Sequence, residues 1–294
     1  MVPFVHSEKL ADGLRLSASE DPTSPVLDRF YAGYDRAFIL PDERENLAGF
    51  RDCLTLNLTL PNMFGRRHSE QVLTIEAADG TLLGGANFLA TAMTSPGGPP
   101  VSLALNYVYV EAAARGKGLA RVLIESSQRM ANLALSGHTG GPAPAVFIEQ
   151  NDPLALSDAD YAADTAHAGI DQIERLEIWA RLGARLVDYA YIQPALSAGQ
   201  DPDDGLIYAA LRYPDANIPA AWFHDHLQSF FGVSVRKGAP LESDPVCTAQ
   251  LAALAQRSEP VALVEVGAAI AALKADRSQG EGLNFRQFAT RGRG

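Results

Sequence analysis

The chain has 294 residues, of which 47% are hydrophobic and 20% are charged. This balance is typical of a folded globular protein with a substantial core, and it excludes extended disorder as the main description. The formal net charge of -11 argues against nucleic acid as a partner, because binding to phosphate backbones needs a concentrated basic surface.

The chain is predicted to begin with a polar lead, two helices and a β-hairpin. Apolar residues recur at helical spacing from Phe30 to Phe38, and again from Leu47 to Leu54 after a helix start at residues 41–43. Strands over residues 71–77 and 81–93 then flank an Asp-Gly pair, which is a strong signal for a hairpin turn.

A buried strand, a glycine loop and a helix are predicted next. Residues 101–110 (VSLALNYVYV) are rich in β-branched, aromatic and apolar side chains, which is typical of a central strand. The segment 115–120 (RGKGLA) follows, and apolar residues from Leu119 to Leu133 then mark one face of a helix. A short strand at residues 145–149 is expected to run parallel to the strand before the loop.

The remaining elements suggest a closing pair of strands and a helical extension. Residues 151–168 are acidic and small and are interpreted as a surface excursion or lid. A helix then ends at Gly183, and strands are predicted at 185–192 and 206–213. Beyond Pro214 only helices are expected, so we place one domain at residues 1–213 and a helical C-terminal extension at 214–294.

The glycine loop has the chemistry of an anion site. A strand that ends in a glycine-bearing turn and opens a helix leaves several backbone amides unpaired and directed at one place. Gly116 and Gly118 remove side chains that would obstruct close approach, and Lys117 and Arg121 can add positive charge at the rim. The spacing matches neither a nucleotide P-loop nor a dinucleotide fingerprint. A glycine-rich turn without a ligand is the structural alternative.

The segment 106–120 (NYVYVEAAARGKGLA) resembles the signature of the GNAT acetyltransferases, Arg/Gln-x-x-Gly-x-Gly/Ala. Arg115, Gly118 and Ala120 fill its three specified positions, and the resemblance extends over residues 30–213. It implies an α/β fold with a mostly antiparallel sheet, two splayed parallel central strands and flanking helices. The residues that it would place on coenzyme A are Tyr107, Val108, Tyr109, Val110, Arg115, Gly116, Lys117, Gly118, Leu119 and Ala120.

Candidates for acid and base follow from the expected cleft. Glu149, at the end of the second parallel strand, is the expected base, and Asn106, at a place where some family members carry a catalytic polar side chain, is expected to orient a water or the acceptor. Trp179 stands where the family often has a tyrosine as proton donor. Tyr191 is the substitute that we select, and the other substitutes are Tyr189 and Tyr109.

These features predict transfer of an acetyl group from acetyl-CoA to a primary amine of a small molecule. The alternative is a catalytically silent acyl-CoA sensor, which the Trp179 departure leaves open. A third reading is an enzyme for longer acyl chains, with a hydrophobic tunnel beside Val108. The extension is expected either to cap the acceptor cleft or to form a homodimer contact, and Glu43 and Arg44 are read as helix-start charges that are candidates for touching the acceptor.

The remaining observations concern compartment and metals. Cys53 and Cys247 suggest neither a disulfide framework nor a cysteine metal site, so a cytoplasmic protein is expected. No stretch has the length of apolar sequence that a bilayer span requires, so we expect no membrane partner. His224 and His226 lie two positions apart on a predicted helix and diverge, so they are interpreted as surface residues and no metal is expected.

Overall fold

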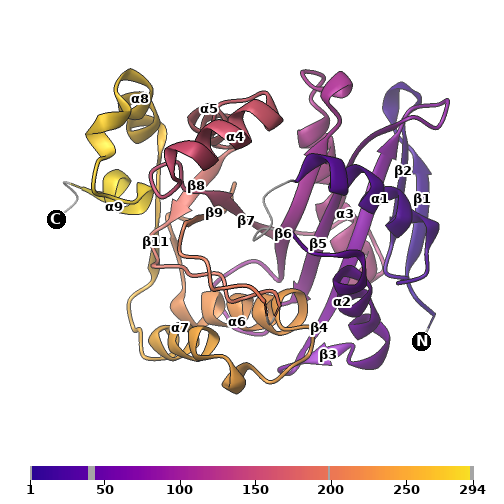
Figure 1. The fold of residues 1–294 in the computed structure, drawn as a ribbon. Helices are drawn as coiled ribbons and strands as arrows, with labels where there is room; N and C mark the ends of the chain where they lie inside the picture. The colour runs from indigo at the N-terminus through magenta and orange to yellow at the C-terminus, as the bar shows by residue number, and fades with distance from the viewer. Residues whose placement is uncertain (1, 39–43, 198, 292–294) are drawn as a thin grey trace.

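The computed structural model describes residues 2–38, 44–197 and 199–291 (Figure 1). Within them, one mixed sheet contains β1 (Val5–Lys9), β2 (Arg15–Ser19), β3 (Asn62–Met63), β4 (Arg66–Glu76), β5 (Leu82–Ala92), β6 (Val101–Val110), β7 (Ala145–Asn151), β8 (Ala184–Val187), β9 (Leu206–Leu211), β10 (Asn217–Ile218) and β11 (Val261–Val264). The strand order is β1-β2-β4-β5-β6-β7-β9-β8-β11-β10, and β3 pairs with β4 outside this path.

Helices cover both faces of the sheet. The α-helices are α1 (Pro25–Ala37), α2 (Leu47–Thr59), α3 (Leu119–Ser136), α4 (Asp158–Ala168), α5 (Gln172–Arg181), α6 (Ala220–Phe230), α7 (Pro245–Ala255), α8 (Gly267–Ala275) and α9 (Phe285–Thr290). A π-helical segment, η4 (Phe231–Val235), continues α6, and short 3-10 turns are η1 (Ala11–Gly13), η3 (Ala112–Ala114), η5 (Leu241–Ser243) and η6 (Arg277–Gly280). Near β4 to β6, α1 and α2 pack on one face and α3 packs on the other (Figure 1).

The first two helices form where the sequence predicts them, and their starts are fixed by caps. The Ser24 side chain caps α1, and the Asn46 side chain caps α2 by accepting a hydrogen bond from the amide of Gly49. Helix α2 therefore begins at Leu47. The start that the sequence suggested at residues 41–43 lies outside the described residues.

The central strands have the expected arrangement. The hairpin of β4 and β5 turns at Asp79 and Gly80, and the strands are antiparallel, as are all the paired strands except β6 and β7. The parallel ladder joins Ser102–Ala104 to residues 145–147 and goes no further. Beyond Ala104 the two strands diverge, which confirms the splayed parallel pair.

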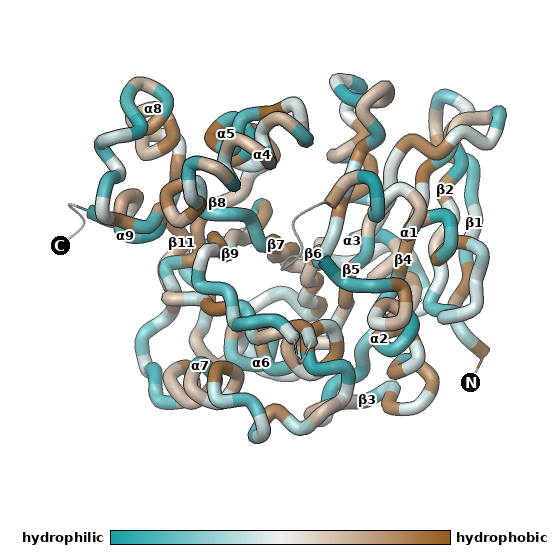
Figure 2. Tube along the Cα trace, in the orientation of Figure 1, coloured by the Kyte–Doolittle hydropathy of each residue, from teal (hydrophilic) through white to brown (hydrophobic). Residues whose placement is uncertain are grey.

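Four parts of the chain differ from expectation. The polar lead contains β1 and β2, in which Leu16 and Ala18 alternate with more exposed residues and face the core. Hydrophilic residues predominate along β1, the edge strand, in the tube of Figure 2. The excursion at residues 151–168 contains α4, and the predicted strand 185–192 ends at Val187. Helices alone were expected after Pro214, but β10 and β11 join the sheet there, and β11 pairs with β8.

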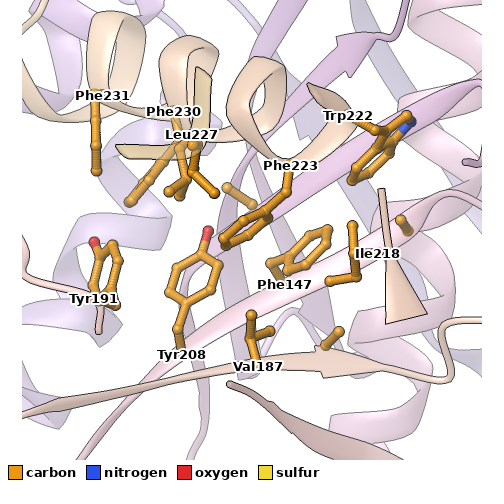
Figure 3. Close-up of a cluster of buried hydrophobic side chains, with 14 of the residues drawn as sticks. Phe147, Val187, Tyr191, Tyr208, Ile218, Trp222, Phe223, Leu227, Phe230 and Phe231 are labelled. Carbon is orange, nitrogen blue, oxygen red and sulfur yellow. The ribbon is translucent and has the colours of Figure 1, made fainter. Parts of the chain in front are cut away.

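The C-terminal extension is attached to the sheet by a large apolar cluster. Figure 3 shows Phe223 and Leu227 of α6 directed at Phe147 of β7 and Tyr208 of β9. The phenyl and phenol rings of Phe147 and Tyr208 are 5.8 Å apart and stacked. The two parts of the chain thus share a sheet and a core, while the boundary at residues 213 and 214 stays a prediction. No helix in the described ranges has the length and apolar character needed to cross a membrane.

Candidate active site

A cavity of about 690 Å³ opens where β6 and β7 part. Its walls come from Leu105 to Val110 of β6, from Ile148 to Asn151 of β7, and from the loop at residues 115–120. Helices α1, α4 and α5 line the end near the loop. Phe230, Ser234 and Val235, which lie in or beside η4, line the far side. The extension therefore forms part of the cavity wall.

The glycine loop presents amides at the start of α3. Gly116 and Gly118 both have φ of +76°, a left-handed conformation that L side chains rarely adopt. The amide of Arg115 donates to the carbonyl of Ala112, so this amide is already used. For the next five amides, residues 116–120, no acceptor lies within the described part of the chain. Those amides and the dipole of α3 suit a phosphate group.

The order of the elements around the loop matches the order expected from the sequence. Two helices, a hairpin, a central strand, a glycine loop and a helix precede a parallel strand that diverges above the loop, as the resemblance implied. The fold is GNAT-like.

No family model matches the sequence, and no curated protein matches it. Solved structures with a similar fold include three N-acetyltransferases, each at low sequence identity. A mutant of SpeG spermidine N-acetyltransferase from Vibrio cholerae is 12% identical, with a TM-score of 0.35 over 68% of this chain and 93% of that chain. A GCN5-related N-acetyltransferase from Kribbella flavida is 18% identical, with a TM-score of 0.32 over 69% of this chain and 99% of that chain. The ribosomal-protein-S18-alanine N-acetyltransferase from Escherichia coli is 13% identical, with a TM-score of 0.33 over 71% of this chain and 93% of that chain.

The loop end of the GNAT-like cavity carries three arginines held by specific partners. Arg36 pairs with Glu111, and Arg175 pairs with Asp164 of α4. The Arg115 side chain donates to the carbonyl of Ala168, the last residue of α4. The carboxylates of Glu111 and Asp164 balance two of these charges, so Arg115 supplies the positive charge beside the phosphate-type loop. Lys117 is exposed and is not among the described lining residues.

Glu149 lies where the sequence analysis expected it, on the cavity wall of β7. The Tyr191 hydroxyl donates to its Oε1, and the Gln193 side-chain nitrogen is 3.1 Å from both carboxylate oxygens. Tyr191 itself is 5% exposed and is not among the described lining residues. Burial, together with the negative charge of Glu149, raises the pKa of Tyr191 well above its usual range. This geometry makes Tyr191 a positioning residue for Glu149.

The other candidates for the proton donor are engaged elsewhere. The Tyr109 hydroxyl donates to the carbonyl of Phe30 at 2.9 Å, and the Tyr189 hydroxyl donates to the carbonyl of Gln250 at 2.9 Å. Trp179 of α5 lines the cavity. The indole thus lies on the wall, but it cannot supply the proton that the family's tyrosine gives.

A bulge in β6 aims Asn106 at the cavity. Asn87 of β5 pairs with Tyr107 and Leu89 pairs with Ala104, so two residues of β6 lie opposite the single residue Phe88. The extra residue brings Asn106 to the face that carries α2 and η4. There its Nδ2 lies 3.1 Å from the Asn87 Oδ1. Asn106 lines the cavity, as predicted, but in a network that the sequence did not reveal.

The residue that the sequence analysis missed is Glu70 of β4. Its carboxylate lines the cavity although the residue is only 1% exposed. It accepts hydrogen bonds from Nδ2 of Asn87 at 2.6 Å, Nδ2 of Asn106 at 3.1 Å and Oγ of Ser234 at 2.9 Å. Burial raises the pKa of Glu70 to about 7, and the three hydrogen bonds act in the opposite direction. One partial signal was available: Asn87 and Asn106 are polar residues within two predicted strands, and Glu70 directly precedes the predicted strand at residues 71–77.

Of the two helix-start charges considered for contact with the acceptor, Arg44 does not line the cavity. Arg44 pairs with Asp35 and is not among the described lining residues, while Glu43 lies outside the described residues. The neighbouring Glu45 does line the cavity, and its carboxylate pairs with Lys237, which follows η4. An ion pair between the segment before α2 and the extension thus closes this side of the site.

The histidine pair of α6 was interpreted as a surface feature, which is wrong for His226. This ring is 2% exposed, and its Nδ1 and Nε2 contact the hydroxyls of Ser102 and Tyr208, the latter at 2.6 Å. His224 points elsewhere and contacts Asp225. The two rings diverge as their spacing implied, but α6 packs on the sheet and carries one of them into the core. Across the ranges that the structure describes, no group of three or more His, Cys, Asp and Glu residues is arranged to hold a metal.

Proposed function

We propose that this protein is a GNAT-type N-acetyltransferase that transfers an acetyl group from acetyl-CoA to a primary amine of a small molecule. The observation that carries the proposal is the set of five amides at residues 116–120, which open α3 at the mouth of the cavity between the diverging strands. A phosphate-binding loop joined to a cleft of about 690 Å³ suits a long ligand with a phosphate at one end.

In this proposal the pyrophosphate of the donor lies on the amides of the loop. The pantetheine arm follows residues Tyr107, Val108, Tyr109 and Val110 of β6, on the side from which β7 has separated. Arg115 would contribute charge from the base of the loop while its guanidinium braces α4. The thioester then lies deeper in the cavity, toward Asn106 and Glu149.

The chemistry is direct attack in a ternary complex. An ordinary primary ammonium has a pKa of about 10.4, so only about one molecule in 2,500 is neutral at pH 7. The neutral nitrogen attacks the thioester carbonyl, the C–N bond forms, and the C–S bond breaks with its electron pair on sulfur. Glu149, held by Tyr191, would accept a proton that the nitrogen loses, and Asn106 would orient the acceptor.

A second candidate is a silent acyl-CoA sensor with the same fold. The position of Trp179 favours it, because an indole lines the cavity where the family often has its acidic tyrosine. Both candidates require binding of acetyl-CoA, so binding alone does not separate them.

The test incubates the full chain with acetyl-CoA and a panel of small primary amines. Release of free thiol, together with the mass of the acetylated amine, measures transfer, and calorimetry measures binding of acetyl-CoA. The proposal expects thiol release that depends on the amine. Binding without release for any amine would instead establish the sensor, and absence of binding would remove both candidates. Two free, buried cysteines support a further proposal, that the protein works in the cytoplasm.

A further inference from the structure

The carboxylate of Glu70 is surrounded by neutral donors. All three groups that donate to it are amides or a hydroxyl, from Asn87, Asn106 and Ser234. Among the described residues, no lysine, arginine or histidine pairs with it. The nearby cation Lys237 pairs with Glu45 instead. Glu70 is therefore a buried negative charge on a cavity wall without a positive partner from this part of the protein.

Such a group is stable only if something compensates for its lost hydration. A buried, unpaired carboxylate is costly, and it normally responds by holding its proton to higher pH. A cationic group of a ligand that enters the cavity would supply the missing charge. The ammonium of a primary amine has the right charge and three hydrogen-bond donors.

The hydrogen bonds leave room for such a donor. An ionised carboxylate has about four acceptor positions. Asn87 and Asn106 both donate to Oε1, whereas Ser234 donates to Oε2. One position on Oε2 therefore remains for an N–H from the acceptor.

The protein also fixes the place of this carboxylate. The Asn57 side chain of α2 donates to the carbonyl of Glu70 and accepts from its amide, both at 2.8 Å. Asn57 is 5% exposed, so these two hydrogen bonds are shielded from water. Rigid placement of a reacting group is what proton transfer requires.

We propose that Glu70 binds the ammonium group of the acceptor and removes the proton that must leave before the nitrogen can attack. The inference rests on the proposed function and adds the residue that accepts the cationic amine. The proton passes from nitrogen to Oε2 of Glu70, which leaves a neutral amine. After attack on the thioester, Glu149 takes the second proton from nitrogen and the thiolate gains a proton from solvent. Glu70 and Glu149 then return their protons to solvent.

The groups around Glu70 are suited to this cycle near neutral pH. From α2, Cys53 interacts electrostatically with Glu70; its pKa is raised by burial and by the charge of Glu70, so it stays a neutral thiol. The Glu45 and Lys237 pair balances its own charge, and β5 and β6 contribute only amides. A carboxyl group with a pKa of about 7 can take up and release a proton at the working pH.

The experiment compares wild type, Glu70→Gln and Glu149→Gln in thiol release from acetyl-CoA between pH 5.5 and 10. Wild-type kcat/KM should rise with a midpoint near pH 7. Glu70→Gln should lower kcat/KM about 100-fold at pH 7. The loss should shrink as the pH approaches the pKa of the free amine, about 10.4. Glu149→Gln should be slow at every pH, and acetyl-CoA should bind all three equally.

Glu76→Gln is the matched control. Glu76 is a buried glutamate on the same strand, but it pairs with Arg15 and Arg29 and is not among the described cavity residues. This variant should retain the wild-type rate and midpoint.

Two results would overturn the inference while leaving the proposed function intact. In one, Glu70→Gln keeps the wild-type rate and midpoint. In the other, its loss does not recover at high pH, which would make Glu70 a structural residue only. If wild type binds acetyl-CoA yet releases no thiol with any amine, the proposed function fails and the role of Glu70 fails with it.

Discussion

Nδ2 of Asn106 lies 3.1 Å from Oε1 of Glu70, although their strands β6 and β4 are separated by β5. Asn87 of β5 lies between them and contacts both. Three neighbouring strands thus contribute one polar side chain each to a row across the sheet. Networks of this kind are stable in a core only when nearly every member is satisfied, and this one ends at a cavity.

The buried carboxyl of Glu70 should oppose folding at alkaline pH. Its pKa rises from the ordinary 4.5 to about 7 in the folded state, so folding is favoured below pH 4.5 and this advantage is lost as the pH rises through 7. Glu70→Gln removes this penalty. Relative to wild type, the variant should therefore be more stable at pH 8 than at pH 5 by roughly 2.5 kcal/mol, at ~1.36 kcal/mol per pH unit.

Urea unfolding of both proteins at the two pH values measures this difference. Other titrating groups change both proteins alike and cancel in the comparison. A pH-independent difference would show that the folded-state carboxyl titrates normally.

Ser234 is expected to set the pH at which Glu70 works. Its hydroxyl stabilises the ionised carboxylate from 2.9 Å, so Ser234→Ala should raise the pKa of Glu70. Loss of one hydrogen bond to a charged group should move the midpoint of kcat/KM upward by about one pH unit, with little change at the alkaline plateau. Ser243→Ala, in the same extension but bonded to the carbonyl of Pro240, should leave the midpoint unchanged. An unmoved midpoint in Ser234→Ala would contradict the assignment.

Gly118→Asp should abolish tight binding of acetyl-CoA. It places a carboxylate among amides that are to hold a pyrophosphate, and the dissociation constant should rise at least about tenfold, or ~1.4 kcal/mol. Gly137→Asp is the matched control, because Gly137 also has positive φ, +80°, and ends the same helix at its other terminus. Calorimetry with acetyl-CoA measures both. Equal affinities of wild type and Gly118→Asp would place the phosphate site elsewhere.

His226 should be important for stability and should make the fold sensitive to acid. His226→Ala leaves the hydroxyls of Ser102 and Tyr208 without their partner and opens a void beside Phe147, so a loss of about 3 kcal/mol is expected. His224→Ala, two positions away and half-buried, should cost less than about 1 kcal/mol. Denaturant unfolding at pH 7 gives both values.

The same residue gives a pH dependence in the wild type. Burial lowers the pKa of His226 to about 3, below the 6.5 of an unfolded chain. The unfolded state therefore binds the extra proton between these values, and stability should fall as the pH drops from 6.5 toward 3. In a neutral variant of His226 this part of the acid sensitivity should disappear.

The parts of the fold that were predicted from sequence are those with local signals. The Asp-Gly turn before Thr81 marks the hairpin, the run from Val101 marks the central strand, and Gly118 marks the start of α3. The short strands after Pro214 escaped, because β10 has two residues and β11 has four, too few to show a period. β10 pairs with β11, and β11 pairs with β8, which lies far from it in sequence.

The site divides in the same way. Lys117 and its neighbours form a loop whose chemistry is contained in six consecutive residues. Glu70 gains its properties from Asn87, Asn106 and Ser234, which are 17, 36 and 164 positions away, and only the folded sheet brings these together. A glutamate just before a predicted strand looks like a solvated residue until its neighbours across the sheet are known.

The π-helical turn at Phe231–Val235 has a consequence for engineering. It carries Ser234 to the cavity from a stretch of chain that is more than a hundred residues from the phosphate-type loop. In the proposed enzyme, the residues assigned to the amine and those assigned to the acetyl-CoA donor can therefore be varied separately. Libraries that vary Phe230, Ser234 and Val235 should change which amines are accepted, while the loop at residues 115–120 that is to bind the donor stays unchanged.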